Sequence, residues 1–199
     1  MIDRRRFLLA TGALMVLPTA ALAEGVTANA VFFDPDAPAI GNPKGDVTLV
    51  EFFDYQCPFC KRNHPVVEKL IARDAKLRVV MKDWPVFGPP SVYASQLVLG
   101  AQSNGKYKAA MAALMKTKGR LTREDVDRAL SGGGVNPKQA EAGYKAARKR
   151  IDGLLARNDQ QATLLGLAGT PGFVVGTTIY PGAMDEPALR AAIAKARKG

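Results

Sequence analysis

Two cysteines separated by two residues stand where a strand is expected to end and a helix to begin. Residues 46–53 are apolar or β-branched at nearly every position, which is typical of a central strand covered on both faces. An apolar helical stripe follows in residues 64–76, and residues 77–85 have the pattern of a second strand. Strand, helix and strand in this order predict a βαβ unit with parallel strands and a right-handed crossover.

The rest of the chain alternates between helical and strand patterns. Helices are expected over about residues 91–167, then strands in 169–182 and a last helix in 186–198. This order predicts one α/β sheet over residues 47–199, interrupted by the helical insertion at 91–167. Residues 24–46 contain three prolines and are expected to form an extended lead-in. They are short for a separate oligomerisation domain, so we expect a monomer.

Residues 1–23 have the order of a secretory signal peptide. Three arginines at residues 4–6 precede an apolar run over 7–17, and a small-x-small exit predicts cleavage after Ala23. The run is shorter than the roughly 20 apolar residues that span a bilayer, which disfavours an uncleaved anchor. The arginines also resemble a twin-arginine signal, so the Sec and twin-arginine routes both stay open. We expect an exported, periplasmic protein.

The composition is basic, with 28 Lys and Arg against 18 Asp and Glu and a net charge of +10 at pH 7. Such a balance can indicate a nucleic-acid or membrane partner. Here the cations are spread over helical segments among alanines, as in residues 145–150, which is typical of solvated helix faces. We therefore expect no nucleic-acid partner, while a positive surface favours contact with anionic lipid or acidic partners.

Cys57 and Cys60 are the only cysteines of the chain, and His64 is its only histidine. As a purely stabilising disulfide the pair is poorly placed, because a ring this short contributes only about 2 kcal/mol. A metal site made of these three residues would lack the fourth ligand that structural zinc needs. A cysteine pair with this spacing beside a βαβ pattern instead predicts redox activity, and no metal is expected.

The expected helix start also favours thiol chemistry. A thiolate at a helix N-terminus faces unpaired backbone N–H groups and the positive end of the helix dipole, which lower its pKa. Pro58 suits the first helical turn, where its missing N–H is not needed. Cys57 is expected at an exposed lip as the attacking thiol. Cys60, one turn further, is expected to be shielded and to resolve a mixed disulfide.

Residues 49–61, Leu-Val-Glu-Phe-Phe-Asp-Tyr-Gln-Cys-Pro-Phe-Cys-Lys, together with Gly-Thr-Pro-Gly-Phe at 169–173, resemble the DsbA-like thiol-disulfide oxidoreductases. The resemblance covers essentially the whole mature chain. It implies a thioredoxin-like fold with an inserted helical domain. It also implies that Thr170-Pro171 is the cis-proline dipeptide of the family, which lies against the cysteine pair and offers backbone hydrogen bonds to a bound peptide. The residues alone leave Pro171 as a proline at a strand start.

The resemblance also assigns Glu51, six residues before Cys57, to the buried acid that family members keep beneath the disulfide. In that position it is a candidate proton acceptor for Cys60, and burial would raise its pKa toward the range useful for proton transfer. The other interpretation is an ordinary acid at a sheet edge.

Phe59 departs from the pattern of strongly oxidising relatives, which carry a histidine between the cysteines. A phenylalanine holds no positive charge beside the Cys57 thiolate, so a milder oxidant is expected. Lys61, Arg62 and His64 are near in sequence, but their orientation stays open. His64 is either an active-site neighbour or an ordinary histidine on the helix surface.

These features together predict an exported enzyme that transfers its Cys57–Cys60 disulfide to cysteines of other exported proteins. No bound cofactor is expected, and by resemblance a quinone-linked membrane partner would reoxidise the pair. One alternative is a disulfide isomerase or reductase that must be kept reduced. A second, of a different class, is a metal-binding or copper-tolerance protein that uses the same thiols.

Overall fold

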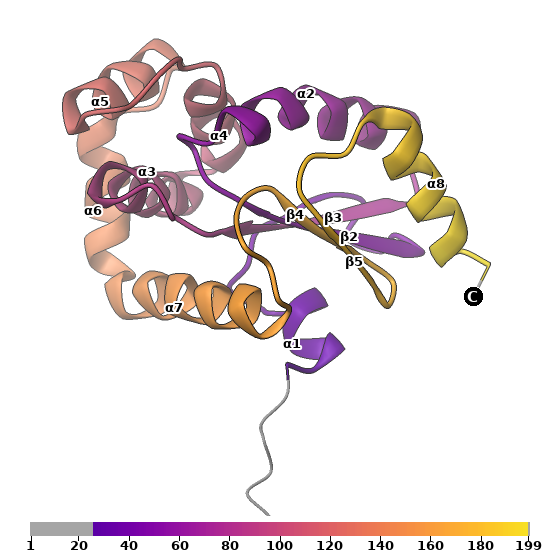
Figure 1. Cartoon of the computed structure of the whole chain (residues 1–199). Helices are drawn as coiled ribbons and strands as arrows, with labels where there is room; N and C mark the ends of the chain where they lie inside the picture. Colours follow the sequence, from indigo (N-terminus) through magenta and orange to yellow (C-terminus); the bar gives the residue numbers. More distant parts are fainter. Residues whose placement is uncertain (1–25, 199) are drawn as a thin grey trace, which may run out of the picture.

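The central unit of the fold is a pair of parallel strands joined by a helix. A computed structural model describes residues 26–198. In it β2 (Val47–Phe53) and β3 (Leu77–Asp83) pair in parallel along their whole length, and α2 (Pro58–Arg73) is the crossover between them. The βαβ unit predicted from the apolar pattern is therefore confirmed (Figure 1).

Three further strands complete a five-stranded mixed sheet of order β1-β3-β2-β4-β5. β4 (Gly172–Val175) pairs antiparallel with β2, and β5 (Thr178–Pro181) pairs antiparallel with β4. On the other side β1 (Ala39–Gly41) pairs antiparallel with β3. The strand that precedes the cysteines, β2, is thus the central strand of the sheet.

The segment before β2 differs from the extended lead-in predicted over residues 24–46. It contains a short helix, α1 (Ala28–Phe32), and the edge strand β1. The reason is burial, since Val31 of α1 and Ile40 of β1 are only 2% and 7% exposed and pack into the main core. The predicted signal peptide, with its cleavage after Ala23, lies outside the described residues.

All helices of the predicted insertion lie between β3 and β4. Five α-helices and a 3-10 helix follow one another there: α3 (Pro89–Gly100), η1 (Ala101–Asn104), α4 (Tyr107–Met115), α5 (Arg123–Gly132), α6 (Pro137–Ala146) and α7 (Arg148–Leu164). The last helix, α8 (Glu186–Ala196), is capped by Asp185, whose side chain accepts a hydrogen bond from the Ala188 amide at 2.8 Å. The predicted α/β thioredoxin-like fold with an inserted helical domain is confirmed.

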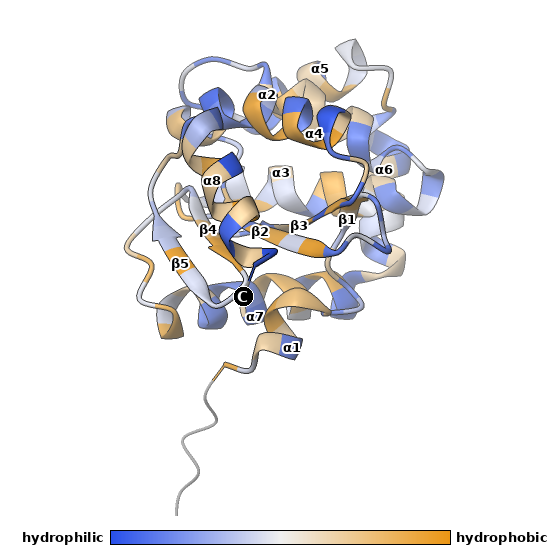
Figure 2. Cartoon of the chain, turned by 90° about the vertical axis from the view of Figure 1, so that its right-hand side faces the viewer, coloured by the Kyte–Doolittle hydropathy of each residue, from blue (hydrophilic) through white to orange (hydrophobic). Residues whose placement is uncertain are grey.

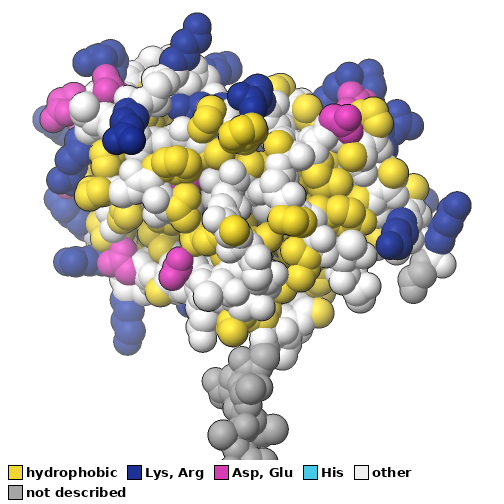
Figure 3. Space-filling model, viewed as in Figure 1, with side chains coloured by type: hydrophobic (Ala, Val, Ile, Leu, Met, Phe, Trp, Pro, Cys, Tyr) yellow, Lys and Arg dark blue, Asp and Glu magenta, His cyan; other side chains and the backbone are white. Residues whose placement is uncertain are grey.

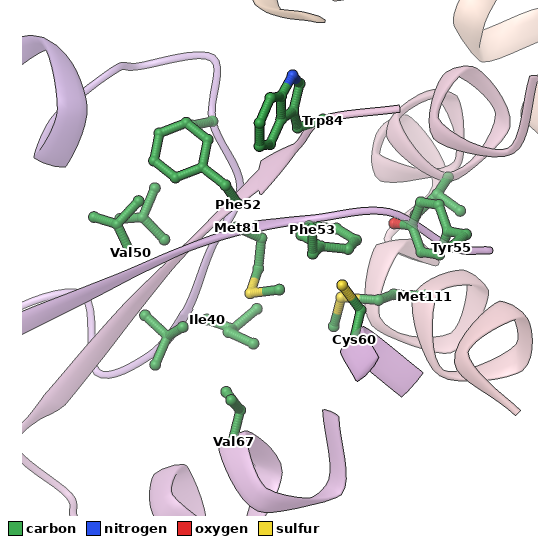
Figure 4. Close-up of a cluster of buried hydrophobic side chains, with 14 of the residues drawn as sticks. Ile40, Val50, Phe52, Phe53, Tyr55, Cys60, Val67, Met81, Trp84 and Met111 are labelled. Atoms are coloured by element: carbon green, nitrogen blue, oxygen red, sulfur yellow. The ribbon is translucent and has the colours of Figure 1, made fainter. Parts of the chain in front are cut away.

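Helices cover the sheet on both faces. α2 and α8 lie on one face and α7 with α1 on the other, while the remaining helices of the insertion gather beyond one end of the sheet (Figures 1 and 2). The core between these layers includes Leu49, Val50, Phe52 and Phe53 of β2, which are all fully buried. Figure 4 shows Cys60 at the margin of this core, near Phe53 and Tyr55. None of the helices in residues 26–198 combines the length and the apolar content that crossing a membrane requires.

Candidate active site

The cysteine pair occupies the junction between β2 and α2. β2 ends at Phe53, a short turn follows, and Cys57 is the N-cap of α2 with Pro58 in the first turn. The Cys57 amide donates to the Asp54 carbonyl oxygen at 3.2 Å, which closes the turn. The Cys60 amide points at the Cys57 sulfur, with 3.5 Å between nitrogen and Sγ. A cap position of this kind turns unpaired helix amides toward the capping atom, here Sγ.

Both cysteines are buried. Cys57 is 1% exposed and Cys60 is 0% exposed. The prediction that Cys57 lies at an exposed lip is therefore wrong. The loop before β4 explains the burial, because the Cys57 thiol donates to the carbonyl oxygen of Thr170 at 3.1 Å. Pro58 and Phe59, beside the pair, are exposed. The two cysteines therefore differ less in exposure than in electrostatic surroundings.

The surroundings drive the pKa values of the two thiols apart. A hydrogen bond from the Cys60 thiol is the main cause that lowers the pKa of Cys57 to about 6, and the amides of Cys60 and Phe59 act in the same direction. Burial raises the pKa of Cys60, and its hydrogen bond to Cys57 and the charge of Glu51 raise it further. Near neutral pH this arrangement favours a Cys57 thiolate beside a protonated Cys60.

Glu51 lies in the middle of the sheet, where β2 pairs it with Met81 of β3 and Phe173 of β4. It is 1% exposed, so the alternative of an acid at a sheet edge is wrong. Neither carboxylate oxygen has a hydrogen-bond partner within residues 26–198. Burial, and then the charge of Cys57, raise its pKa to about 8. A carboxyl group in this state can carry a proton near neutral pH.

Thr170 and Pro171 are brought to the cysteines from the far end of the chain. The Thr170–Pro171 peptide bond is cis, as the family resemblance implies. It directly precedes β4, whose antiparallel register sets Gly172 opposite Phe52 of β2. The sheet thereby brings the Thr170 carbonyl to a thiol that is 113 residues away in sequence.

Two cations flank the start of α2, and their orientation was open from the sequence. The Arg62 guanidinium stacks on the half-exposed ring of Phe59, 4.4 Å from its centroid. The Lys61 ammonium is buried and has no hydrogen-bond partner within residues 26–198. Burial lowers its pKa, whereas the negative charges of Asp54 and the two cysteines raise it. Of these two cations, Lys61 is thus the one whose pKa responds to the charge of the cysteine pair.

We expect Lys61→Met to raise the pKa of Cys57 in the reduced protein, because the variant keeps the aliphatic stem but removes a nearby positive charge. A rise of up to about 1 pH unit is expected for a partly screened charge. Thiolate absorbance followed against pH measures the shift. Arg62→Met is the matched control, with a smaller expected shift because its guanidinium lies on Phe59. Equal shifts in both variants, or none in Lys61→Met, would contradict this role.

His64 is buried within α2, at 6% exposure, so the alternative of a surface histidine is wrong. Its Nε2 lies 3.4 Å from Oε1 of Glu68, on the next turn of the helix. Burial lowers its pKa, and the charge of Glu68 acts against this. Among residues 26–198, no three His, Cys, Asp or Glu side chains are grouped so that they could hold a metal ion. The structure therefore does not bring His64 together with the cysteines as a metal site.

A hydrogen-bonded network under the site escaped the sequence analysis. Asp54 is fully buried and accepts from the Gln56 amide at 2.6 Å, the Ser91 hydroxyl at 2.7 Å and the Phe87 amide at 3.1 Å. The Gln56 side-chain amide donates to the same Ser91 oxygen at 2.9 Å. Asp54 comes directly after the predicted strand, where an Asp side chain often accepts from the backbone amide two residues on and forms an Asx turn. This signal could have indicated the contact between Asp54 and Gln56.

A further buried acid lies at the end of β3. Asp83 is fully buried and pairs with Phe53 in the β2–β3 register. Burial raises its pKa to about 7, and the charge of Asp54 adds to the rise. The largest causes of its shift do not include the cysteines, whereas the charge of Cys57 is the second cause for Glu51.

In sequence and structure this chain is similar to thioredoxin-like proteins. The family described as Thioredoxin matches residues 34–195. A thioredoxin-like oxidoreductase from Silicibacter pomeroyi is similar in structure, with a TM-score of 0.83 and 37% identity over 87% of this chain and 99% of that one. A periplasmic thioredoxin-like protein from Salmonella enterica has a TM-score of 0.75 and 28% identity over 86% and 95%. The thiol-disulfide exchange protein alpha-DsbA2 from Wolbachia pipientis has a TM-score of 0.78 and 25% identity over 84% and 90%.

Similarity to curated proteins covers only part of those proteins. The Na(+)/H(+) antiporter NhaA 3 of Salinispora tropica is 26% identical over 176 residues, which is 87% of this chain. The same alignment covers 27% of the antiporter. This chain thus spans about a quarter of the curated relative that it matches.

Proposed function

This chain belongs to the thioredoxin family. On that premise we propose that it is a thiol-disulfide oxidoreductase that donates its Cys57–Cys60 disulfide to reduced cysteines of exported proteins, which its similarity to a thioredoxin-like oxidoreductase and to a thiol-disulfide exchange protein supports. The observation that carries the proposal is the Cys57 thiol at the N-cap of α2, with a pKa lowered to about 6. A stabilised thiolate stabilises the reduced form of the enzyme. The disulfide form is then the more oxidising one, which favours transfer to a client.

The transfer proceeds in two exchange steps. A client thiolate attacks the Cys57 sulfur, the Cys57–Cys60 bond breaks, and Cys60 leaves with the electron pair. A second client thiolate then attacks the client's own sulfur in the mixed disulfide and expels Cys57 as a thiolate. The client has lost two electrons and the enzyme has gained them, so the enzyme ends as a dithiol and the client as a disulfide.

Glu51 is proposed to supply the proton that the leaving Cys60 needs. The pKa of Cys60 is raised, so its thiolate is a poor leaving group unless a proton reaches it. The Glu51 carboxyl has a pKa raised to about 8, and its charge acts on Cys60, so it is a suitable donor near neutral pH. In the reverse direction, when the pair is reoxidised, the carboxylate would accept the same proton.

Thr170 and Pro171 are proposed to hold the client beside Cys57. In the structure the Thr170 carbonyl oxygen accepts a hydrogen bond from the Cys57 thiol at 3.1 Å. A client backbone that takes the place of this contact would find hydrogen-bonding groups at the correct distance from the reacting sulfur.

Export to the periplasm and a quinone-linked membrane partner that reoxidises the pair remain part of the proposal. The signal-like order of residues 1–23 and the similarity to a periplasmic Salmonella protein support the location. No bound cofactor is needed for the exchange itself, because the electrons move between sulfur atoms.

The function is tested by mixing the oxidised protein with a reduced, unfolded protein that contains two cysteines. We expect one client disulfide for each enzyme disulfide consumed, measured by mass spectrometry after acid quenching. Reduction of an oxidised client by the dithiol enzyme, without the opposite reaction, would instead indicate the reductase alternative. Titration of the dithiol with Zn(II) and Cu(I) separates the metal-binding alternative.

A further inference from the structure

A groove with a volume of about 980 Å³ lies beside the cysteine pair. Its lining residues come from three segments: Gln56 with the first turns of α2, residues 86–90 at the end of the β3–α3 loop and the start of α3, and residues 117–121 between α4 and α5. Thr170 and Pro171 are not among the described residues that line it. The groove is therefore a second surface next to Cys57, distinct from the one that the Thr170 carbonyl provides.

The side chain of Gln56 ties the two walls of the groove together. Its Oε1 accepts from the Leu121 amide at 2.8 Å, and its Nε2 donates to the Phe87 carbonyl oxygen at 3.2 Å. Because Gln56 directly precedes Cys57, the groove keeps a defined position relative to the reacting sulfur. A segment bound there would lie within a few residues of a cysteine that attacks Cys57.

The charge of the groove has one sign. Four of the described lining residues are cations, and none is acidic: Lys61, Arg62, Lys118 and Arg120. None of these four forms an ion pair within residues 26–198. The Lys61 ammonium is in addition buried without a hydrogen-bond partner in that part of the chain. Four neighbouring cations without ion-pair partners give the groove a positive potential, so a carboxylate from outside would be bound favourably here.

The wall opposite α2 supplies exposed apolar surface. Phe87 is 50% exposed and Val86 is 43% exposed, and Pro89 and Pro90 continue the same wall. Figure 3 shows that hydrophobic side chains spread across the face of the molecule that it views, with Lys and Arg side chains beside them toward the top. Large exposed hydrophobic side chains that line a groove are typical of surfaces that bind a partner.

We propose that this groove binds the segment that flanks the reacting cysteine of an unfolded client, and that it selects segments carrying Asp or Glu beside an apolar residue. This inference rests on the proposed function, because a client must reach Cys57 in extended form. The cations then raise the rate of encounter with acidic segments, and the apolar wall holds their hydrophobic neighbours.

Two synthetic peptides with the same pair of cysteines test the inference. One carries Glu and Leu around each cysteine, and the other carries Lys and Leu at the same positions. The second-order rate with the oxidised protein is measured for each and corrected by the rate of that peptide with oxidised glutathione. We expect the acidic peptide to react about tenfold faster at low salt, and this ratio to shrink as salt screens the charges.

A charge-reversed variant and a matched control locate the effect. Lys118→Glu with Arg120→Glu changes two exposed groove cations, and Lys138→Glu with Lys149→Glu makes the same charge change at exposed positions outside the groove. The preference should vanish or invert in the first and persist in the second. If the reversed variant is poorly folded, Lys118→Gln with Arg120→Gln should still lower the ratio.

Three outcomes overturn the inference. A corrected ratio near one in the unchanged protein is the first, and a ratio that survives charge reversal of the groove is the second. Loss of the ratio in the control variant is the third, because it would make net charge the cause. Oxidation of dithiothreitol by the unchanged protein is measured as well. If the protein does not oxidise dithiothreitol, the proposed function is wrong and the inference falls with it; if it does, the three outcomes above bear on the groove alone.

Discussion

Replacing Cys60 by alanine should leave Cys57 linked to client proteins as stable mixed disulfides. In Cys60→Ala the Cys57 thiolate can still attack a disulfide of an exported protein, which breaks that disulfide and expels one client thiolate. In the unchanged protein Cys60 then attacks the mixed disulfide and releases the client, and this escape is removed in the variant. Non-reducing gels of extracts from cells that make the variant, with and without reductant, measure the trapped species. Loss of Cys60 also removes the main cause that lowers the Cys57 pKa, so alkylation of Cys57 should need a higher pH than in the reduced unchanged protein.

Cys57→Ala is the control for this asymmetry. It should form no mixed disulfides, and its remaining thiol should be alkylated slowly, because Cys60 is fully buried and its pKa is raised. A purely stabilising disulfide predicts two equally inert single variants, and a metal site predicts equal loss of metal. Equal alkylation rates together with no trapped species in Cys60→Ala would refute the redox assignment.

Glu51→Gln should slow the exchange steps at neutral pH, because glutamine cannot pass a proton to or from Cys60. The expected loss is on the order of 100-fold, the lower end of what general acid–base catalysis contributes. Single-turnover oxidation of a two-cysteine peptide between pH 5 and 9 measures it. Asp83→Asn is the matched control, since it removes another buried acid, and the cysteines are not among the main causes of its raised pKa. Similar rates in all three proteins would leave Glu51 with a structural role only.

The same substitution has an opposite effect on stability, and its pH dependence has a definite sign. Burial first, and then the charge of Cys57, raise the Glu51 pKa from 4.5 to about 8. The folded protein therefore holds this proton more tightly than the unfolded chain does, so the stability due to protonated Glu51 is complete below pH 4.5 and is lost as pH rises through about 8. Glu51→Gln abolishes that loss.

Urea unfolding of the oxidised proteins measures this effect without a Cys57 thiolate. The free energy of unfolding of Glu51→Gln, relative to the unchanged protein, should increase as the pH rises from 4.5 toward 8, because burial, the larger cause of the Glu51 shift, acts here without the charge of Cys57. The increase is at most about 5 kcal/mol from the size of such a shift. A difference that does not change with pH would show that Glu51 is not protonated in the folded protein.

The elements that carry the cysteines were predictable because their signals are local. The continuous apolar run of β2 and the three- and four-residue spacing of apolar side chains in α2 can be seen within each segment, and Pro58 marks the start of the helix. The cis bond before Pro171 and the burial of Glu51 followed from the family resemblance rather than from spacing, because both depend on β4 pairing with β2.

The errors and omissions concern contacts between distant segments. Cys57 was expected to be exposed because nothing local indicates that Thr170 covers it. The edge strand β1 was not predicted because it is only three residues long and follows prolines. The groove depends on hydrogen bonds from Gln56 to two segments that lie 31 and 65 residues further along the chain. The spacing of apolar residues in the sequence gives no sign of such contacts.

The central claim, donation of the Cys57–Cys60 disulfide, is tested most directly by the reduction potential of the pair. The purified protein is equilibrated with mixtures of reduced and oxidised glutathione at pH 7, and the fraction of dithiol enzyme is determined by acid trapping. The lowered Cys57 pKa predicts an oxidising pair, and Phe59 in place of a histidine predicts a milder one than the strongest oxidants. The expected potential lies between about −180 and −120 mV. A potential near that of thioredoxin, about −270 mV, would mean that the pair reduces its partners and would contradict the proposed function.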